Sequence, residues 1–269
     1  MPGPRKHQKR LNRFHRTTDG QTDMTKTVTI IHTADLHGRL PEAADALLHL
    51  KMSHPNSVLV DSGDAVKSGN LGYIPGDRTL EIMDDLGYHA MALGNRETHV
   101  WREIMALKLS QAKFPLLCAN LDASEGLPVL SHIMSSVAGV NIAFIGLTVP
   151  MVTRRMWTRR LCSILFEDPL ETARILVPQI RPHADVVVVL SHLGLKIDGA
   201  LAEQVGGIDL ILGGHSHVET HTPVVINTTV IAHPGAWGRY ATVACISLNS
   251  PGECKICTHL VPLKGTETN

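Results

Sequence analysis

The sequence predicts an α/β fold built on a largely parallel β-sheet. Short β-branched or apolar runs alternate with helical patterns through most of the 269 residues, and this alternation implies crossover connections between parallel strands. The run at residues 184–190 is almost entirely apolar, as expected of a strand that is covered on both faces. The runs after residue 229 follow one another with only turn residues between them. This last part of the sheet should therefore be antiparallel.

The first half of the chain alternates strands with helices. Residues 28–32 are β-branched and apolar, and Gly38 beyond them lets the chain turn sharply. Residues 41–54 place alanine and leucine at helical spacing, and Pro41 suits a first helical turn. Further strands are expected at residues 57–60, 89–93 and 115–121, and further helices at residues 79–86 and 101–111.

The second half begins less regularly. Two runs, 129–135 and 140–146, are expected to form a hairpin, whereas residues 150–166 show no clean period. A helix at residues 169–180 then restores the alternation. The remaining elements expected are a strand at 184–190, a helix at 201–205, a strand at 208–212, and closely spaced strands at 230–232, 241–248 and 255–263.

Charge is distributed unevenly between an amino-terminal tail and the rest of the chain. Residues 1–26 hold seven Lys/Arg against two acids, so residues 27–269 hold 18 Lys/Arg against 23 acids, a net charge of −5. We expect residues 1–26 to be a disordered tail, or a leader from an upstream start codon with Met24 as the true start. The acidic body and the 4% aromatic content argue against extended nucleic-acid binding. No segment approaches membrane-spanning length.

The five cysteines are scattered and imply no disulfide framework. Reduced thiols in the cytoplasm are therefore the expected state. Cys254 and Cys257 have the spacing of a zinc knuckle, but a tetrahedral zinc site needs four ligands and only these two are grouped. A structural role for this pair is favoured over a metal site.

Polar residues follow five of the predicted strands. Asp35 and His37 are two positions apart, so in an extended chain their side chains point the same way and can converge on one cation. A single such residue is more often a core or surface residue, but a set at successive strand ends indicates a shared site. The five strand ends carry Asp35 with His37, Asp64, Asn95, His192, and His215 with His217.

This order of motifs resembles that of the calcineurin-like metallophosphoesterase superfamily, D-x-H, G-D, G-N-H-[ED], H and G-H-x-H. The resemblance covers roughly residues 28–250, and the sequence around the motifs is most similar to the catalytic domain of the 5′-nucleotidase family. It implies a four-layer α/β/β/α sandwich with mixed sheets, formed by residues 27–269 as a single domain.

The resemblance also implies two divalent metal ions. One would be bound by Asp35, His37, Asp64 and His217, and the other by Asp64, Asn95, His192 and His215, with Asp64 bridging them. Nitrogen and oxygen ligands without thiolate suit Mn, Fe or Zn, of which we favour Mn. Two such ions can activate a bridging hydroxide and attract an anionic phosphate. Asp61 is expected either to orient a ligand or to make a plain strand-end hydrogen bond.

The chain departs from the family pattern in two respects. Arg96 replaces the motif histidine that assists the leaving group, and His99 replaces the acid that partners this histidine in nucleotidases. Arginine cannot donate a proton at working pH, but its guanidinium can hold phosphate oxygens. We therefore expect Asn95, Arg96 and His99 to be catalytic, with His99 as the acid if it reaches the site. The sequence stops soon after the catalytic region, so we expect no base-stacking domain of the 5′-nucleotidase kind, and nucleoside specificity is not implied.

The predicted function is hydrolysis of small phosphoric esters by a phosphatase or a phosphodiesterase, with nucleotides as one candidate class of substrate. One alternative is a nuclease of the same superfamily, which the net charge of −5 on residues 27–269 disfavours. The other is a non-catalytic metal-binding protein that has lost turnover through the altered pair Arg96 and His99. No membrane partner is expected, and the sequence leaves the oligomeric state open.

Overall fold

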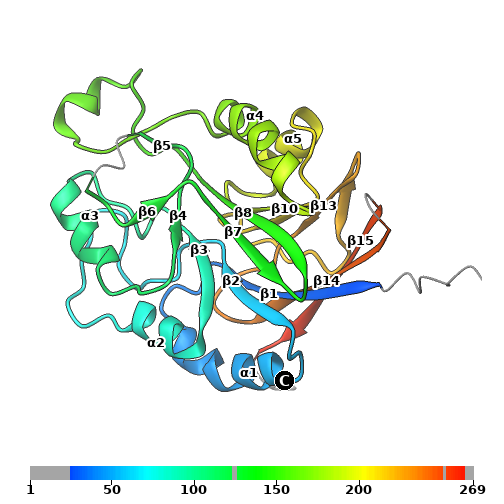
Figure 1. Cartoon of the computed structure of the whole chain (residues 1–269). Helices are drawn as coiled ribbons and strands as arrows, with labels where there is room; N and C mark the ends of the chain where they lie inside the picture. Colours follow the sequence, from blue (N-terminus) through cyan, green and yellow to red (C-terminus); the bar gives the residue numbers. More distant parts are fainter. Residues whose placement is uncertain (1–24, 123–125, 251–252, 264–269) are drawn as a thin grey trace, which may run out of the picture.

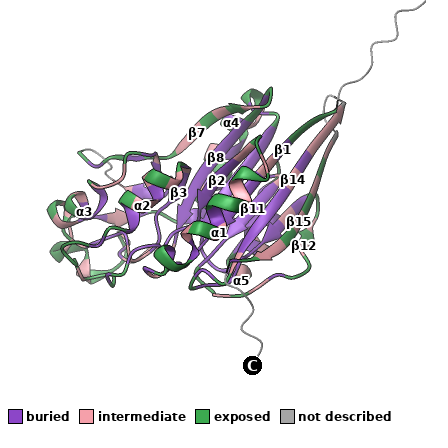
Figure 2. Ribbon diagram, turned by 90° about the horizontal axis from the view of Figure 1, so that it is seen from below, coloured by how far each residue is buried: buried purple, intermediate pink, exposed green. Residues whose placement is uncertain are grey.

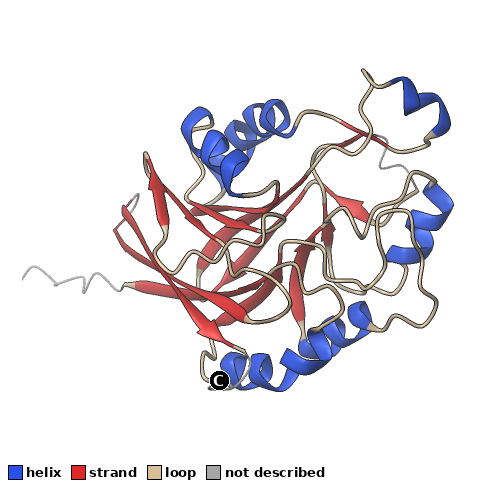
Figure 3. Ribbon diagram, turned by 180° about the vertical axis from the view of Figure 1, so that it is seen from behind, coloured by secondary structure: helices blue, strands red, loops and turns tan. Residues whose placement is uncertain are grey.

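The computed structural model describes residues 25–122, 126–250 and 253–263. Two β-sheets lie face to face, with helices on both outer sides (Figure 1). Figure 3 shows the same arrangement from behind, with blue helices flanking the red strands. The structure confirms the four-layer α/β/β/α sandwich with mixed sheets that the resemblance implies, whereas the single sheet suggested by the strand–helix alternation is divided into two.

Within the described residues, one sheet has seven strands in the order β15-β14-β1-β2-β3-β4-β6. Strands β1, β2, β3, β4 and β6 run parallel in this sheet, and β14 and β15 are antiparallel to their neighbours. The bounds are β1 (Lys26–Thr33), β2 (Ser57–Asp61), β3 (Tyr88–Ala92), β4 (Leu116–Leu117), β6 (Val129–Leu130), β14 (Tyr240–Ser250) and β15 (Glu253–Pro262). The helices on its outer face are α1 (Leu40–Met52), α2 (Thr79–Leu86) and α3 (Arg102–Leu109).

The second sheet has six strands in the order β12-β13-β11-β10-β8-β7, counted over the same described ranges. The bounds are β7 (His132–Val137), β8 (Val140–Thr148), β10 (Val186–His192), β11 (Leu210–Gly213), β12 (Val224–Ile226) and β13 (Thr229–Ala232). Helices α4 (Pro169–Ile180) and α5 (Leu195–Gln204) pack on its outer face. The connecting segments contain the strand pair β5 (Leu121–Asp122) and β9 (Leu165–Phe166), and the 3₁₀ helices η1 (Trp157–Leu161) and η2 (Arg181–His183).

The apolar core has three layers, which explains the continuous apolar strands. The middle layer lies between the sheets, where Ile30 of β1 faces residues such as Phe144 and Val188 of the other sheet. The outer layers lie between each sheet and its helices. The central strands of both sheets are accordingly coloured as buried in Figure 2, whereas edge strands such as β7, β12 and β15 include intermediate and exposed residues and the helices expose one side. No helix in the described residues is both long enough and apolar enough to cross a membrane.

The expected strand at residues 115–121 is wrong as a single element, because the chain leaves the seven-stranded sheet after Leu117. The Ala119 N–H donates to the Gly146 carbonyl of the facing sheet at 2.7 Å. The Asn120 side chain bonds both backbone groups of Thr148. A Cβ on Gly146 would lie 2.4 Å from the Leu117 carbonyl oxygen, so glycine is needed where the two sheets approach. The apolar run therefore joins two short strands.

Other boundaries differ in similar ways. The expected strand at residues 129–135 divides between the sheets as β6 and β7, although β7 does form the expected hairpin with β8. Helix α5 begins at Leu195, six positions before the expected start, because its buried Asp198 interrupts the apolar pattern. Strand β12 was not expected. Lys26, assigned above to the tail, begins β1 opposite Leu248, and residues 1–24 lie outside the described residues.

Candidate metal centre

The polar residues predicted at strand ends meet where the carboxyl ends of strands from both sheets come together. Asp35 and His37 follow β1, Asp64 follows β2, and Asn95 follows β3, all in the seven-stranded sheet. His192 ends β10 of the other sheet, and its β11 is followed by His215 and His217. The site is therefore built by two sheets and not by one sheet edge.

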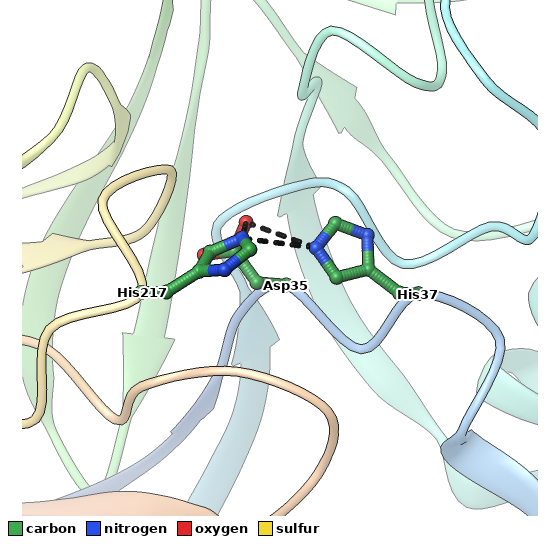
Figure 4. A group of neighbouring side chains, drawn as sticks. All are labelled: Asp35, His37 and His217. Atoms are coloured by element: carbon green, nitrogen blue, oxygen red, sulfur yellow. Dashed lines mark hydrogen bonds and ion pairs between the residues drawn. The ribbon is translucent and has the colours of Figure 1, made fainter.

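One group of possible metal ligands consists of Asp35, His37 and His217 (Figure 4). The Nε2 atoms of the two imidazoles lie 3.0 Å apart. The Asp35 Oδ1 atom lies 3.3 Å from His217 Nε2 and 3.8 Å from His37 Nε2. This oxygen is buried and has no hydrogen-bond partner. Because buried carboxylate oxygens are normally paired, the arrangement fits a cation.

A second group consists of Asp35, Asp64 and His192, whose ligand atoms all lie within 4.8 Å of one another. His192 Nε2 lies 3.5 Å from Asp64 Oδ1 and 3.2 Å from Asn95 Oδ1. The other ring nitrogen, Nδ1, donates to the Ser62 carbonyl at 2.8 Å. This bond fixes the tautomer and turns the Nε2 lone pair toward the centre, as is usual for metal-binding histidines.

Two details differ from the ligand sets that the family resemblance implies. Asp35 is common to both groups, whereas the resemblance gives the bridging role to Asp64. His215 is exposed and belongs to neither group, although its ring centroid lies 5.0 Å from that of His192. Its backbone N–H instead donates to Asp35 Oδ2 at 2.7 Å. The bridging role of Asp64 and the ligand role of His215 stay predictions.

Five of the predicted ligands have a left-handed backbone. Their φ angles are +50° at Asp35, +49° at His37, +57° at Asp64, +71° at His215 and +55° at His217. This conformation is uncommon for residues other than glycine and costs roughly 1–3 kcal/mol each. The loops hold one another in it, because the Asp35 N–H donates to the Gly63 carbonyl and the His37 N–H to the Asp64 carbonyl, both at 2.9 Å. Such strain is typical of functional sites.

Burial and neighbouring charges shift the pKa values of several residues at the centre. Burial raises the pKa of Asp35 to about 7. Burial, together with Arg96, lowers the pKa of His37 to about 4. Burial opposes protonation of His192, but hydrogen bonding to Asp64 raises its pKa to about 9. A divalent ion would offset the charge of the buried carboxylates and take the place of the proton that His192 otherwise binds on the side of Asp64.

The loop that carries Asp64 is held by Glu97 and Asp61. Glu97 is fully buried and accepts the N–H groups of Asp64 and Gly94 at 2.9 Å and that of Val66 at 3.1 Å. Asp61 accepts from the Thr33 hydroxyl at 2.6 Å and from the Gly63 N–H at 2.7 Å. These are strand-end hydrogen bonds, which is one of the two roles expected for Asp61.

Sequence reasoning missed a buried pair beneath the centre, formed by His233 and Asp198. The His233 Nε2 atom donates to Asp198 Oδ2 at 2.8 Å, and the Ser191 hydroxyl donates to Asp198 Oδ1. Both residues are at most 1% exposed, and Ser191 immediately precedes His192. His233 directly follows strand β13. This position is the same strand-end signal that pointed to the predicted ligands.

The structure places Trp237 against the first ligand group. Its backbone N–H donates to the Asp35 carbonyl at 2.8 Å. Its ring packs edge-on against His217, with centroids 4.9 Å apart, and is 44% exposed. The indole therefore orients His217 and forms part of the outer wall of the centre.

The structure brings Arg96, but not His99, into contact with the predicted ligands. The backbone N–H of Arg96 donates to Asp64 Oδ1 at 2.7 Å, and the side-chain Nε of Arg96 lies 3.7 Å from Asp64 Oδ2. His99 is 6% exposed and uses Nδ1 to accept the Trp101 N–H at 3.0 Å. It lines a cavity of about 290 Å³, together with Asn70. The Asn70 Oδ1 atom accepts from Asn95 Nδ2 at 2.7 Å.

Comparison with known proteins decides the family. Residues 28–219 match the family model for calcineurin-like phosphoesterases. The chain belongs to the calcineurin-like phosphoesterase family. This confirms the resemblance found in the motifs, and the family's divalent-metal chemistry agrees with the donor atoms described above.

The relatives of this calcineurin-like phosphoesterase include nucleotidases. It is 29% identical to the uncharacterized metallophosphoesterase YunD of Bacillus subtilis, covering 84% of this chain and 50% of YunD. It is 27% identical to the 5′-nucleotidase of Mus musculus, covering 72% of this chain and 38% of that protein. The chain thus spans half or less of the length of these curated relatives.

Solved structures agree on the fold. The 5′-nucleotidase precursor of Thermus thermophilus superposes with a TM-score of 0.74 and 25% identity, covering 88% of this chain and 54% of that one. The calcineurin-like phosphoesterase YfkN of Bacillus subtilis gives a TM-score of 0.75 at 20% identity, covering 91% of this chain and 93% of that one. The second likeness establishes the fold alone.

Proposed function

We propose that the chain is a dimetal-dependent hydrolase that acts on small phosphoric esters. One observation carries the proposal: two carboxylates and three imidazoles converge between the sheets, and the buried Asp35 Oδ1 atom has no hydrogen-bond partner. Similarity to metallophosphoesterases and 5′-nucleotidases supports the same reaction class.

The residues present fit two divalent ions. His37, His217 and Asp35 would hold one ion, and His192 and Asp64, with Asn95, would hold the other. When bound, the ions supply Lewis acidity to a phosphoryl oxygen and make water more acidic. Two divalent ions exceed the charge of two carboxylates, so the centre would attract an anionic phosphate. Nitrogen and oxygen donors without thiolate suit Mn, Fe or Zn, of which we propose Mn.

Arg96 and His99 have separate roles in this proposal. The Arg96 side chain lies beside Asp64, at the edge of the centre, where its fixed charge can hold phosphate oxygens. His99 accepts a hydrogen bond at Nδ1, so the neutral ring carries its proton on Nε2. That N–H can donate a hydrogen bond to a leaving group that reaches the cavity beside Asn70, whereas full proton transfer would need the imidazolium, with Nδ1 released from the Trp101 N–H. No contact joins His99 to the ligands of the centre in the described residues, so this role depends on the position of the substrate.

The competing functions make different demands on the surface. A nuclease needs a positive field along its substrate, and residues 27–269 carry a net charge of −5. In a metal-binding protein without turnover, the positive charge of Arg96 beside the ligand Asp64 would weaken metal binding without helping a reaction. The relatives named as 5′-nucleotidases make a nucleotide a reasonable first substrate. Cytoplasmic localisation stays a prediction, supported by the free cysteines among the described residues.

The test is to load the purified chain with Mn²⁺, count the bound ions and assay alkyl and aryl monoesters, diesters, nucleotides and duplex DNA. Hydrolysis of small esters with about two ions bound is the expected result. Two bound ions without turnover on any substrate would favour the non-catalytic protein. Preferential cleavage of the duplex would favour the nuclease.

A further inference from the structure

The cavity of about 290 Å³ next to the metal centre has a predominantly apolar lining. Three of the residues that line it belong to the folded core and are at most 8% exposed, namely Val152, Ile164 and Phe166. Phe166 lies in β9, which pairs with β5, so this wall is fixed by backbone hydrogen bonds. The apolar side chains around the cavity are Leu71, Val100, Met151, Val152, Ile164 and Phe166. We call this cavity the apolar pocket.

A hydrogen bond joins the apolar pocket to the predicted metal ligand Asn95. Asn95 places its Oδ1 atom 3.2 Å from His192 Nε2 and donates its Nδ2 to Asn70 Oδ1 at 2.7 Å. Asn70 is one of the two polar residues that line the pocket, and His99 is the other. A phosphoryl group held at the centre therefore lies within a short reach of an apolar space with two polar groups at its edge.

This lining determines what the pocket can hold. Ligand sites combine apolar walls with a few polar groups that fix orientation, and clefts for drug-sized molecules measure roughly 300–1,000 Å³. At about 290 Å³, the apolar pocket suits one compact group. A sugar or a glycerol moiety would leave most of its hydroxyls without partners among these side chains, which is costly. A compact aromatic or branched aliphatic group would bury its surface without that cost.

We propose that the apolar pocket binds a compact apolar or aromatic group on the alcohol side of the phosphoester. The proposal rests on the function proposed above and adds a substrate class to it, namely esters selected by an apolar leaving group. It also places the leaving group against His99, the residue from which a proton would come.

Binding of non-hydrolysable phosphonates to the Mn²⁺-loaded chain tests the pocket without requiring turnover. Benzylphosphonate should bind at least roughly tenfold more tightly than methylphosphonate, because hydrophobic pockets discriminate by about this factor per added group. Val152→Phe fills the pocket and should remove the difference by weakening benzylphosphonate alone. Val225→Phe is the matched control, since Val225 is 61% exposed on β12 and does not line the pocket. It should preserve the difference.

A second variant guards against misfolding of Val152→Phe. Leu71 lines the pocket but is 72% exposed, so Leu71→Ser leaves the core intact and should weaken benzylphosphonate several-fold without affecting methylphosphonate. Equal affinities of the two phosphonates for the wild-type chain, or a difference that survives both variants, would overturn the pocket. A clear preference for benzylphosphonate without hydrolysis of any ester would instead refute the proposed reaction and leave the pocket in place.

Discussion

The Nε2 atoms of His37 and His217 lie 3.0 Å apart, although the residues are separated by 180 positions in the sequence. Burial lowers the pKa of both rings, so both favour the neutral form. Two ring nitrogens at this distance, both close to Asp35 Oδ1, are held together best by a shared cation. This geometry sets the first prediction.

His217→Ala should reduce the bound divalent ions from about two per chain to about one. The metal affinity of the group formed by Asp35, His37 and His217 should fall by at least about 10–100-fold. This is the loss typical when a residue that only hydrogen-bonds to a metal ligand is removed, and His217 is a predicted ligand itself. Elemental analysis after dialysis against Mn²⁺ measures this directly. His221→Ala is the matched control, because His221 lies in the same loop with its side chain 66% exposed. Two tightly bound ions in His217→Ala would show that the ligand assignment is wrong.

Arg96 and His99 should be distinguished by the leaving group of the substrate. His99→Ala should slow alkyl phosphates far more than aryl phosphates, by up to about 10²–10⁴-fold, because only poor leaving groups need a proton donor. Arg96→Ala should slow both classes similarly, since charge stabilisation at the phosphoryl group does not depend on the leaving group. Steady-state kinetics with both ester classes provides the measurement. Equal losses on both classes in His99→Ala would leave His99 with a structural role alone.

Glu97→Gln should destabilise the chain by about 1–3 kcal/mol, because a side-chain NH₂ group would then face backbone N–H donors that now share a carboxylate. Glu97 accepts three such groups, including the N–H of Asp64. Urea unfolding monitored by circular dichroism gives the free energy of unfolding. Glu203→Gln, at an exposed position of α5, should change it little. Equal effects of the two substitutions would argue against a supporting role for Glu97.

Gly213→Ala should cost about 1–3 kcal/mol through overpacking. The added Cβ would lie 2.1 Å from His233 Nε2 and 2.5 Å from Asp198 Oδ2, so the buried pair beneath the centre would have to move. Gly206→Ala is the control, because a Cβ at Gly206 meets no atom within 4 Å. Thermal unfolding of both variants tests this. A Tm for Gly213→Ala as high as that of Gly206→Ala would mean that the pair adjusts without cost.

A truncated chain beginning at Met24 should keep the Tm, the metal content and the activity of the full chain on a small ester. The expectation follows from the position of the described strands and of every predicted ligand, all of which lie beyond Met24. Failure of the truncated chain to fold would show that residues 1–23 contribute to the packed structure. The division into a tail and a domain of residues 27–269 stays a prediction until then.

The fold class, most strand positions and most of the residues that meet at the centre follow from local patterns in the sequence. Burial on both faces selects apolar β-branched runs, and Asp, Asn and His residues that recur after several such runs indicate one shared site. The sequence also shows that Arg96 replaces the motif histidine, because this replacement can be read from a single position.

Only the tertiary structure decided which strands pair and what lies around the ligands. The runs at residues 115–121 and 129–135 each divide between two sheets, because hydrogen bonds to distant segments such as Gly146 decide where a strand ends. The same long-range packing makes Asp35 common to both ligand groups, buries His233 against Asp198, and encloses the apolar pocket beside Asn70. Local patterns encode burial and propensity, whereas these contacts join segments far apart in the chain.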